Sequence, residues 1–185
     1  VNEIKEKIMK LSQTIQRKPI VFIGFMGVGK TTIAREVAKR LGRGFVDIDY
    51  EIEKEYQLDI PSIFKQFGEA QFRETEKTLI EKWCKQSKRV ISLGGGAFLN
   101  EETKQLCLAE TLVINLHMPW DEWKERLPIL KKNRPNLQGK SLEEIKELFD
   151  SRIPIYEQYH LQVSIHKDSS IQDITEDDMD QLKYL

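Results

Sequence analysis

The sequence is poor in the features that stabilise or anchor secreted, metal-binding and membrane proteins. It has two cysteines in 185 residues, Cys84 and Cys107, at a spacing that fits neither a metal site nor a Cys-x-x-Cys motif. We expect both to be reduced thiols in or near the core. The longest weakly polar run, at residues 19–29, is too short to cross a bilayer, and residues 1–7 are charged, unlike a signal peptide. These absences favour a cytoplasmic protein without a membrane partner.

An excess of charge of either sign is also missing. Lys and Arg total 29 and Asp and Glu total 30, so the formal net charge is -1. General nucleic-acid binders and polybasic membrane anchors carry a basic surplus, so the balance argues against both. Hydrophobic residues make up 39% of the chain and charged residues 32%, which is typical of a globular protein. The length predicts one domain, 1–185.

Short apolar runs typical of buried strands alternate with segments of helical periodicity. The predicted strands are at residues 20–23, 45–49, 89–93, 111–116 and 161–165. The predicted helices are at residues 2–16, 31–41, 69–86, 100–109, 119–127 and 141–159, with others ending near 67 and beginning after 169. This alternation predicts an α/β fold, a five-stranded parallel sheet with helices on both faces. Such sheets bind ligands beyond the carboxyl ends of their strands.

Residues 24–31 read GFMGVGKT and match the phosphate-loop pattern G-x-x-x-x-G-K-[ST] between a predicted strand and a predicted helix. Glycines let the backbone N–H groups surround a phosphate, and the helix N-terminus adds its dipole. Lys30 would bridge the β and γ phosphates, and the Thr31 hydroxyl would ligate Mg²⁺. The glycine spacing differs from that of dinucleotide-binding folds. The predicted ATP-binding residues of the loop are Gly27, Val28, Gly29, Lys30, Thr31 and Thr32.

Two aspartates end the second predicted strand. Asp47 and Asp49 are two residues apart, so on a strand they would point to the same side. One could hold Mg²⁺ through water, and the other could orient an acceptor hydroxyl. For Asp47 a purely structural role explains the residue equally well, because an acidic side chain at a strand end can cap the next helix.

The third predicted strand runs into Gly94, Gly95 and Gly96 instead of the aspartate of a Walker B strand. Three glycines permit a ligand to approach the backbone closely and offer N–H donors, although a tight turn is the alternative. Three arginines could form the clamp that an anionic acceptor needs, although each alone is typical of a solvated surface. They are Arg73, Arg134 and Arg152. Glu76, one helical turn after Arg73, could hold its guanidinium.

From about residue 20 to residue 160, the order of these motifs resembles the shikimate kinase family, part of the nucleoside-monophosphate-kinase-like P-loop group. The phosphate loop, the Asp-x-Asp strand and the glycine triplet all match the family pattern. The resemblance implies ATP-dependent phosphorylation of the 3-hydroxyl of shikimate, in aromatic amino-acid biosynthesis, by a monomer that uses Mg²⁺. It also implies substrate-binding helices at about 49–77 and a mobile lid at about 131–140.

The resemblance assigns roles to individual residues. Lys30, Asp49 and Arg134 would be catalytic, with Asp49 binding the acceptor hydroxyl and Arg134 reaching over the phosphates from the lid. Thr31 and Asp47 would lie at the metal. The implied substrate-binding residues are Asp49, Arg73, Gly94, Gly95, Gly96 and Arg152, with the two arginines on the shikimate carboxylate.

Two other interpretations remain open at this point. A gluconate-type kinase on the same fold would also phosphorylate a polyhydroxy carboxylate, although the paired arginines and the glycine triplet favour shikimate. A non-catalytic nucleotide sensor would be favoured by the loss of Lys30, Asp49 or Arg73, and all three are present. The tryptophans are expected to be packing residues and not part of a cofactor site.

Overall fold

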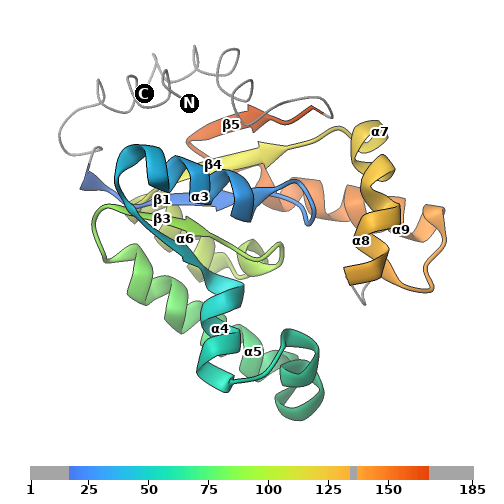
Figure 1. The fold of residues 1–185 in the computed structure, drawn as a ribbon, viewed down its shortest axis with the longest axis horizontal. Helices are drawn as coiled ribbons and strands as arrows, with labels where there is room; N and C mark the ends of the chain where they lie inside the picture. The colour runs from blue at the N-terminus through green and yellow to red at the C-terminus, as the bar shows by residue number, and fades with distance from the viewer. Residues whose placement is uncertain (1–16, 134–136, 167–185) are drawn as a thin grey trace.

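The structure is a computed structural model, and it describes residues 17–133 and 137–166. Five strands form one sheet in the order β2-β3-β1-β4-β5. All neighbouring strands are parallel, which confirms the predicted sheet. Helices cover both faces, with α3 in front of the sheet in Figure 1. The strands are β1 (Ile20–Ile23), β2 (Gly44–Asp47), β3 (Arg89–Ser92), β4 (Leu112–His117) and β5 (Leu161–Ser164).

Strand β1 lies at the centre of the sheet because its four residues are apolar. Ile20, Val21, Phe22 and Ile23 are each at most 2% exposed, between helices on the two faces and strands β3 and β4 on the two edges. A strand without an exposed face can have such a continuous apolar run. The loop that follows Ile23 therefore begins at the middle of the carboxyl edge of the sheet, where ligands bind in this class of fold.

Most helix ends agree with their local sequence signals. Gly42 ends α3 in a left-handed conformation, and Asn100 caps α6 as predicted. Ser141 and Glu144 form the predicted capping box of α9. The helices are α3 (Lys30–Leu41), α4 (Ile48–Tyr56), α5 (Ile60–Cys84), α6 (Glu101–Glu110), α7 (Trp120–Trp123), α8 (Leu127–Asn133) and α9 (Leu142–Arg152). Short 3-10 helices are η1 (Ala97–Leu99), η2 (Lys124–Arg126) and η4 (Ile153–Tyr156).

Three predicted boundaries are wrong. The second strand ends at Asp47, because the Asp47 side chain accepts a hydrogen bond from Tyr50 N and starts α4 at Ile48. Asp47 and Asp49 are therefore not two residues on one strand. Residues 131–133 belong to α8 instead of a polar loop, since Pro128 suits the first turn of a new helix. Helix α9 ends at Arg152 instead of near residue 159, and the chain continues as η4 with Pro154 in its first turn.

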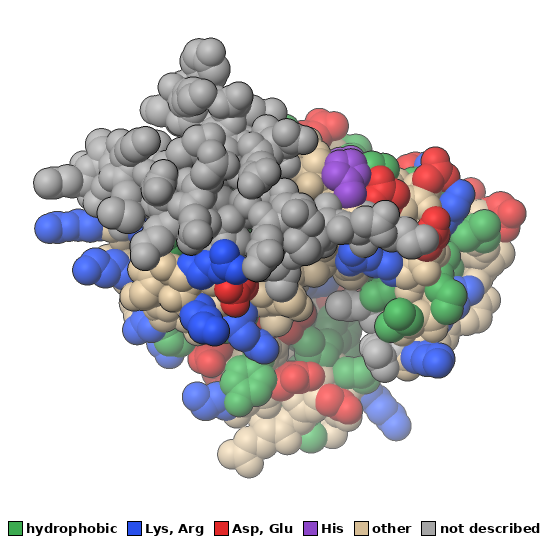
Figure 2. Space-filling view, turned by 45° about the horizontal axis from the view of Figure 1, so that its top comes forward, with side chains coloured by type: hydrophobic (Ala, Val, Ile, Leu, Met, Phe, Trp, Pro, Cys, Tyr) green, Lys and Arg blue, Asp and Glu red, His purple; other side chains and the backbone are tan. Residues whose placement is uncertain are grey.

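Some predictions concern segments that the structure does not describe. The helices expected at residues 2–16 and after 169 lie outside the described residues, as does Arg134. Cys84 and Cys107 are buried as predicted, on α5 and α6. Among the residues that the structure describes, none of the helices is both long and apolar enough to span a membrane. Acidic and basic side chains are interspersed over the described part of the face in Figure 2.

Candidate active site

The phosphate loop connects β1 to α3 and is shaped by close contact with β4. Gly24 begins the loop with φ 138°, a conformation that L side chains rarely adopt, and a Cβ atom there would lie 2.4 Å from Leu116 O. Phe25 and Val28 point their side chains into the core and are at most 2% exposed. Because these two side chains are buried, the loop has a fixed place above the N-terminus of α3, where anions bind.

Lys30 is the first residue of α3, and its side chain returns over the loop. Lys30 Nζ donates hydrogen bonds to Gly24 O at 2.8 Å and to Phe25 O at 3.0 Å. The residue is only 9% exposed, so its positive charge is held in a partly dry site. A buried cation stabilises nearby negative charge more strongly than an exposed one, because water screens it less. Lys30 is therefore placed to neutralise a phosphate on the loop.

Two side chains that sequence reasoning did not assign to the site bind the outer side of the loop. Trp123 Nε1 donates to Met26 O at 2.7 Å, and Arg126 Nη1 donates to Gly27 O at 2.8 Å. Trp123 also packs edge-on against Phe25, with ring centroids 5.0 Å apart, which agrees with the packing role expected for it. These bonds satisfy loop carbonyls from outside. The sequence carries no local signal for them, because both partners lie far along the chain.

A cluster of oxygen atoms lies at the start of α3. Thr31 Oγ1 donates to Asp47 Oδ2 at 2.7 Å and lies 3.5 Å from Ser92 Oγ. Asp47 thus caps α4 with one carboxylate oxygen and meets Thr31 with the other. Hydroxyl and carboxylate oxygens beside a phosphate loop are the donors that Mg²⁺ prefers, so these residues fit that ion. Ser92 was not assigned from the sequence, although its place at the end of β3, beside β1, is where ligands bind.

The predicted acceptor residues meet in one cavity beside the phosphate loop. The cavity has a volume of about 590 Å³, and Phe25 and Met26 of the loop form part of its wall. Its lining includes every residue implied for the acceptor, namely Asp49, Arg73, Gly94, Gly95, Gly96 and Arg152. These come from α4, α5, the loop after β3 and the end of α9. Their convergence could not be read from spacing, because the elements that carry them are far apart in sequence.

The cavity holds an arginine that is oriented by a buried acid. Arg73 Nη1 donates to Glu76 Oε2 at 2.7 Å, while exposed Glu69 lies 3.4 Å from the same guanidinium. The expected pairing of Arg73 with Glu76 is confirmed. Burial raises the pKa of Glu76, and the adjacent Arg73 opposes that shift. Glu76 Oε1 is buried and has no hydrogen-bond partner among the described residues, so one oxygen remains available to a ligand.

The glycine triplet is closely surrounded by these side chains. A Cβ atom on Gly94 would lie 2.7 Å from Asp49 Oδ1 and 3.2 Å from Glu76 Oε1. A Cβ atom on Gly96 would lie 2.6 Å from Arg73 Nη2. The triplet does form the tight turn that the sequence left open as an alternative, and the chain continues into η1. The same turn places the backbone against the carboxylates of Asp49 and Glu76 and the guanidinium of Arg73. Any larger residue at positions 94 or 96 would displace the groups that line the cavity.

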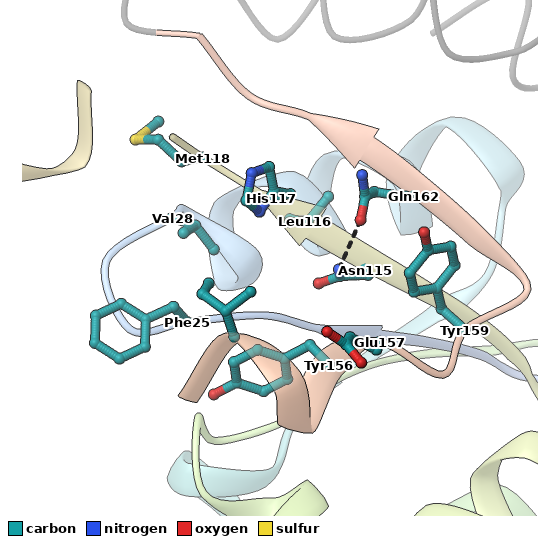
Figure 3. Close-up of a pocket in the computed structure, with 11 residues that line it drawn as sticks. Phe25, Val28, Asn115, Leu116, His117, Met118, Tyr156, Glu157, Tyr159 and Gln162 are labelled. Atoms are coloured by element: carbon teal, nitrogen blue, oxygen red, sulfur yellow. Dashed lines mark hydrogen bonds between the residues drawn. The ribbon is translucent and has the colours of Figure 1, made fainter. Parts of the chain in front are cut away.

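A second, smaller cavity of about 240 Å³ adjoins the first (Figure 3). It lies along the carboxyl half of β4 and the beginning of β5, where Asn115 Nδ2 donates to Gln162 Oε1 at 3.2 Å. Phe25 and Tyr156 line both cavities and form their common wall. Sequence reasoning assigned no site role of its own to either residue.

Comparison with known proteins gives consistent findings. A family model for shikimate kinase matches residues 26–183. The chain is 50% identical over 154 residues to a shikimate kinase of Bacillus licheniformis, covering 83% of this chain and 87% of that protein. A crystal structure of shikimate kinase from Bacteroides thetaiotaomicron is similar with a TM-score of 0.77 and 28% identity, over 90% of this chain and 95% of that one. Shikimate kinase from Acinetobacter baumannii in complex with shikimate is similar with a TM-score of 0.75 and 29% identity, over 92% of this chain and 91% of that one.

Proposed function

The chain belongs to the shikimate kinase family, and we propose that the cavity beside its phosphate loop is where ATP phosphorylates the 3-hydroxyl of shikimate. One observation carries the proposal. A carboxylate, Asp49, and two arginines, Arg73 and Arg152, line one cavity whose wall includes the phosphate loop. Shikimate has both a carboxylate and hydroxyl groups, so this set of side chains offers a partner for each. Incubation with ATP and shikimate should yield shikimate 3-phosphate, detected by mass spectrometry.

The phosphate loop and the N-terminus of α3 bind the phosphates of ATP. Phosphoryl transfer passes through a loose transition state, so catalysis consists mainly of positioning and charge neutralisation. The backbone N–H groups of residues 27–32 bind the phosphates at the N-terminus of α3, and buried Lys30 neutralises the transferred group. The resemblance adds Arg134 to this set, and its role rests on the sequence because it lies outside the described residues.

The larger cavity binds the acceptor, shikimate. Arg73 and Arg152 bind the carboxylate of shikimate through charge-assisted hydrogen bonds, and their planar guanidinium groups fit a planar carboxylate. Asp49, in the first turn of α4, accepts a hydrogen bond from the 3-hydroxyl. As the oxygen–phosphorus bond forms and the bond to ADP breaks, Asp49 takes the hydroxyl proton.

Mg²⁺, when bound, would neutralise charge on the β and γ phosphates. Thr31 and Asp47 would hold it, with Ser92 beside them. We also propose that the enzyme acts as a monomer in the cytoplasm, as the family resemblance and the composition of the sequence led us to expect.

Replacing Asp47 by asparagine should raise the Mg²⁺ concentration needed for half-maximal activity by about 10-fold, because one negative charge beside the metal is lost. Asparagine caps a helix as well as aspartate does, so α4 should remain intact. The measurement is a magnesium titration of kcat after treatment with EDTA. Asp59→Asn is the matched control, since Asp59 caps α5 in the same way, by accepting from Ser62 N, away from the phosphate loop. An equal magnesium requirement in Asp47→Asn and wild type would remove Asp47 from the metal site.

Replacing Glu76 by glutamine should raise KM for shikimate about 3- to 10-fold, because Arg73 loses the charged partner that orients it. The KM for ATP should stay within about twofold, since the phosphate loop is untouched. Initial rates with each substrate varied in turn give both constants. Glu69→Gln is the matched control, because Glu69 contacts the same guanidinium but its side chain is 67% exposed. Equal effects of the two substitutions would show that burial of Glu76 does not matter.

A further inference from the structure

The three carbonyl groups of the glycine triplet are all bonded to the rest of the protein. Gly94 O accepts from Ala97 N at 3.2 Å, and Gly96 O accepts from Leu99 N at 3.1 Å. Gly95 O accepts instead from a side chain, the hydroxyl of Tyr156. By contrast, no acceptor among the described residues takes the N–H groups of Gly95 or Gly96. The triplet thus has its acceptors satisfied by the fold and two of its donors left for a ligand.

Peptide geometry links the bond at Tyr156 to one of these donors. In a trans peptide the C=O of one residue and the N–H of the next point in opposite directions. Holding Gly95 O against Tyr156 therefore directs the N–H of Gly96 away from Tyr156. Gly96 itself is packed against Arg73, whose Nη2 would lie 2.6 Å from a Cβ atom at that position. The Gly96 N–H and the Arg73 guanidinium are thus neighbouring donors at the acceptor cavity.

Tyr156 lies in the hydrophobic core at the boundary between the two cavities. The residue is 3% exposed, yet the smaller cavity leaves open space along one side of its ring. In Figure 3 the ring stands beside Phe25, and its hydroxyl points away from Asn115 and Gln162. Burial raises the pKa of Tyr156, so the hydroxyl remains protonated and can always donate. Arg152 directly precedes η4 and Tyr156 ends it, and both side chains line the larger cavity.

We propose that Tyr156 is a positioning residue for the acceptor: its hydroxyl fixes the peptide plane between Gly95 and Gly96, so that the Gly96 N–H is presented to shikimate beside Arg73. This inference rests on the acceptor cavity proposed above. On this proposal, Tyr156 contributes to the affinity for shikimate and does not contribute to the affinity for ATP. Tyr156 does not touch the reacting atoms, so kcat at saturating shikimate is preserved without its hydroxyl.

The test is Tyr156→Phe, which keeps the ring and removes only the donor. Its Kd for shikimate, measured by isothermal titration calorimetry, should rise roughly 3- to 10-fold, as expected for the loss of one neutral hydrogen bond. Its Kd for ATP and its kcat should stay within about twofold of wild type. Tyr159→Phe is the matched control, because Tyr159 lines the same smaller cavity and its hydroxyl has no hydrogen bond to a described residue. That variant should bind both ligands as wild type does.

A second readout needs no ligand. In ¹⁵N-labelled protein the amide resonance of Gly96 should move in Tyr156→Phe and stay in place in Tyr159→Phe. Unchanged shikimate affinity and an unmoved Gly96 resonance in Tyr156→Phe would overturn the proposal, and so would equal losses of shikimate and ATP affinity, which indicate a general structural defect. If wild-type protein binds no shikimate, the acceptor cavity is wrongly assigned and the inference falls with it.

Discussion

Replacing Lys30 by alanine should lower kcat by about 10²- to 10³-fold, the loss typical when one preorganised electrostatic partner of a transition state is removed. Lys30 is 9% exposed, and its ammonium group is held 2.8 Å from Gly24 O above the phosphate loop. Negative charge spreads over the transferred phosphoryl group in the transition state, so a fixed and partly buried cation stabilises it more than it stabilises bound ATP. The loss should therefore appear in kcat more than in KM for ATP.

The measurement is steady-state ADP release by Lys30→Ala at saturating ATP and shikimate. Lys39→Ala provides a matched control, because Lys39 belongs to the same helix but lies exposed in its last turn. That variant should retain wild-type turnover. If Lys30→Ala remains folded by circular dichroism and keeps near-normal kcat, the proposed mechanism of phosphoryl transfer is wrong.

The second large effect is expected at Arg73. Arg73→Ala should raise KM for shikimate by about 10- to 150-fold, the range that corresponds to the loss of about 1.5–3 kcal/mol from a charge-assisted hydrogen bond. Arg73 is held by buried Glu76 and lies against Gly96, so its guanidinium is already in place before the acceptor arrives. The carboxylate of shikimate then exchanges water for a preorganised partner. The same reasoning applies to Arg152, which lines the cavity from the end of α9.

Separate titrations of ATP and shikimate distinguish the two ligands. In Arg73→Ala and Arg152→Ala, shikimate affinity should fall while ATP affinity changes less than about twofold. Arg73→Lys should recover only part of the loss, because an ammonium group keeps the charge but not the planar fork. Arg40→Ala is the control, since Arg40 forms a similar helical ion pair with Glu36 on α3. Loss of ATP affinity with shikimate affinity preserved would place the acceptor elsewhere.

The features that could be predicted from the sequence depend on neighbouring residues. The phosphate loop is a continuous motif, the buried strand at residues 20–23 is a continuous apolar run, and the capping box of α9 spans four residues. Gly68 is the same kind of signal. It has non-helical φ and ψ of 81° and 168° inside α5, where the sequence predicted one helix to end and another to begin.

The features that could not be predicted depend on contacts across the fold. Trp123 bonds to Met26, and Tyr156 bonds to Gly95, although no local pattern marks either side chain. The direction of Asp49 was wrongly predicted because period-two reasoning assumed that the strand continued. A single side-chain cap by Asp47 ended the strand and put Asp49 on a helix. The bonds of Trp123 and Tyr156 join segments far apart in the sequence, whereas the Asp47 cap is a local bond that the sequence left open as an alternative.

The most direct test of the account is ADP release across a panel of hydroxy-carboxylates, in a coupled assay with Mg²⁺ and ATP at saturation. Shikimate should give ADP release at least about 100-fold faster than gluconate or quinate at equal concentration, because Arg73, Arg152 and Asp49 line one cavity together with the glycine triplet, the set of residues that favours shikimate. Product from the shikimate reaction should carry phosphate on the 3-hydroxyl by ³¹P–¹H NMR. Fast ADP release with gluconate and none with shikimate, or ADP release that is independent of any acceptor, would contradict the assignment.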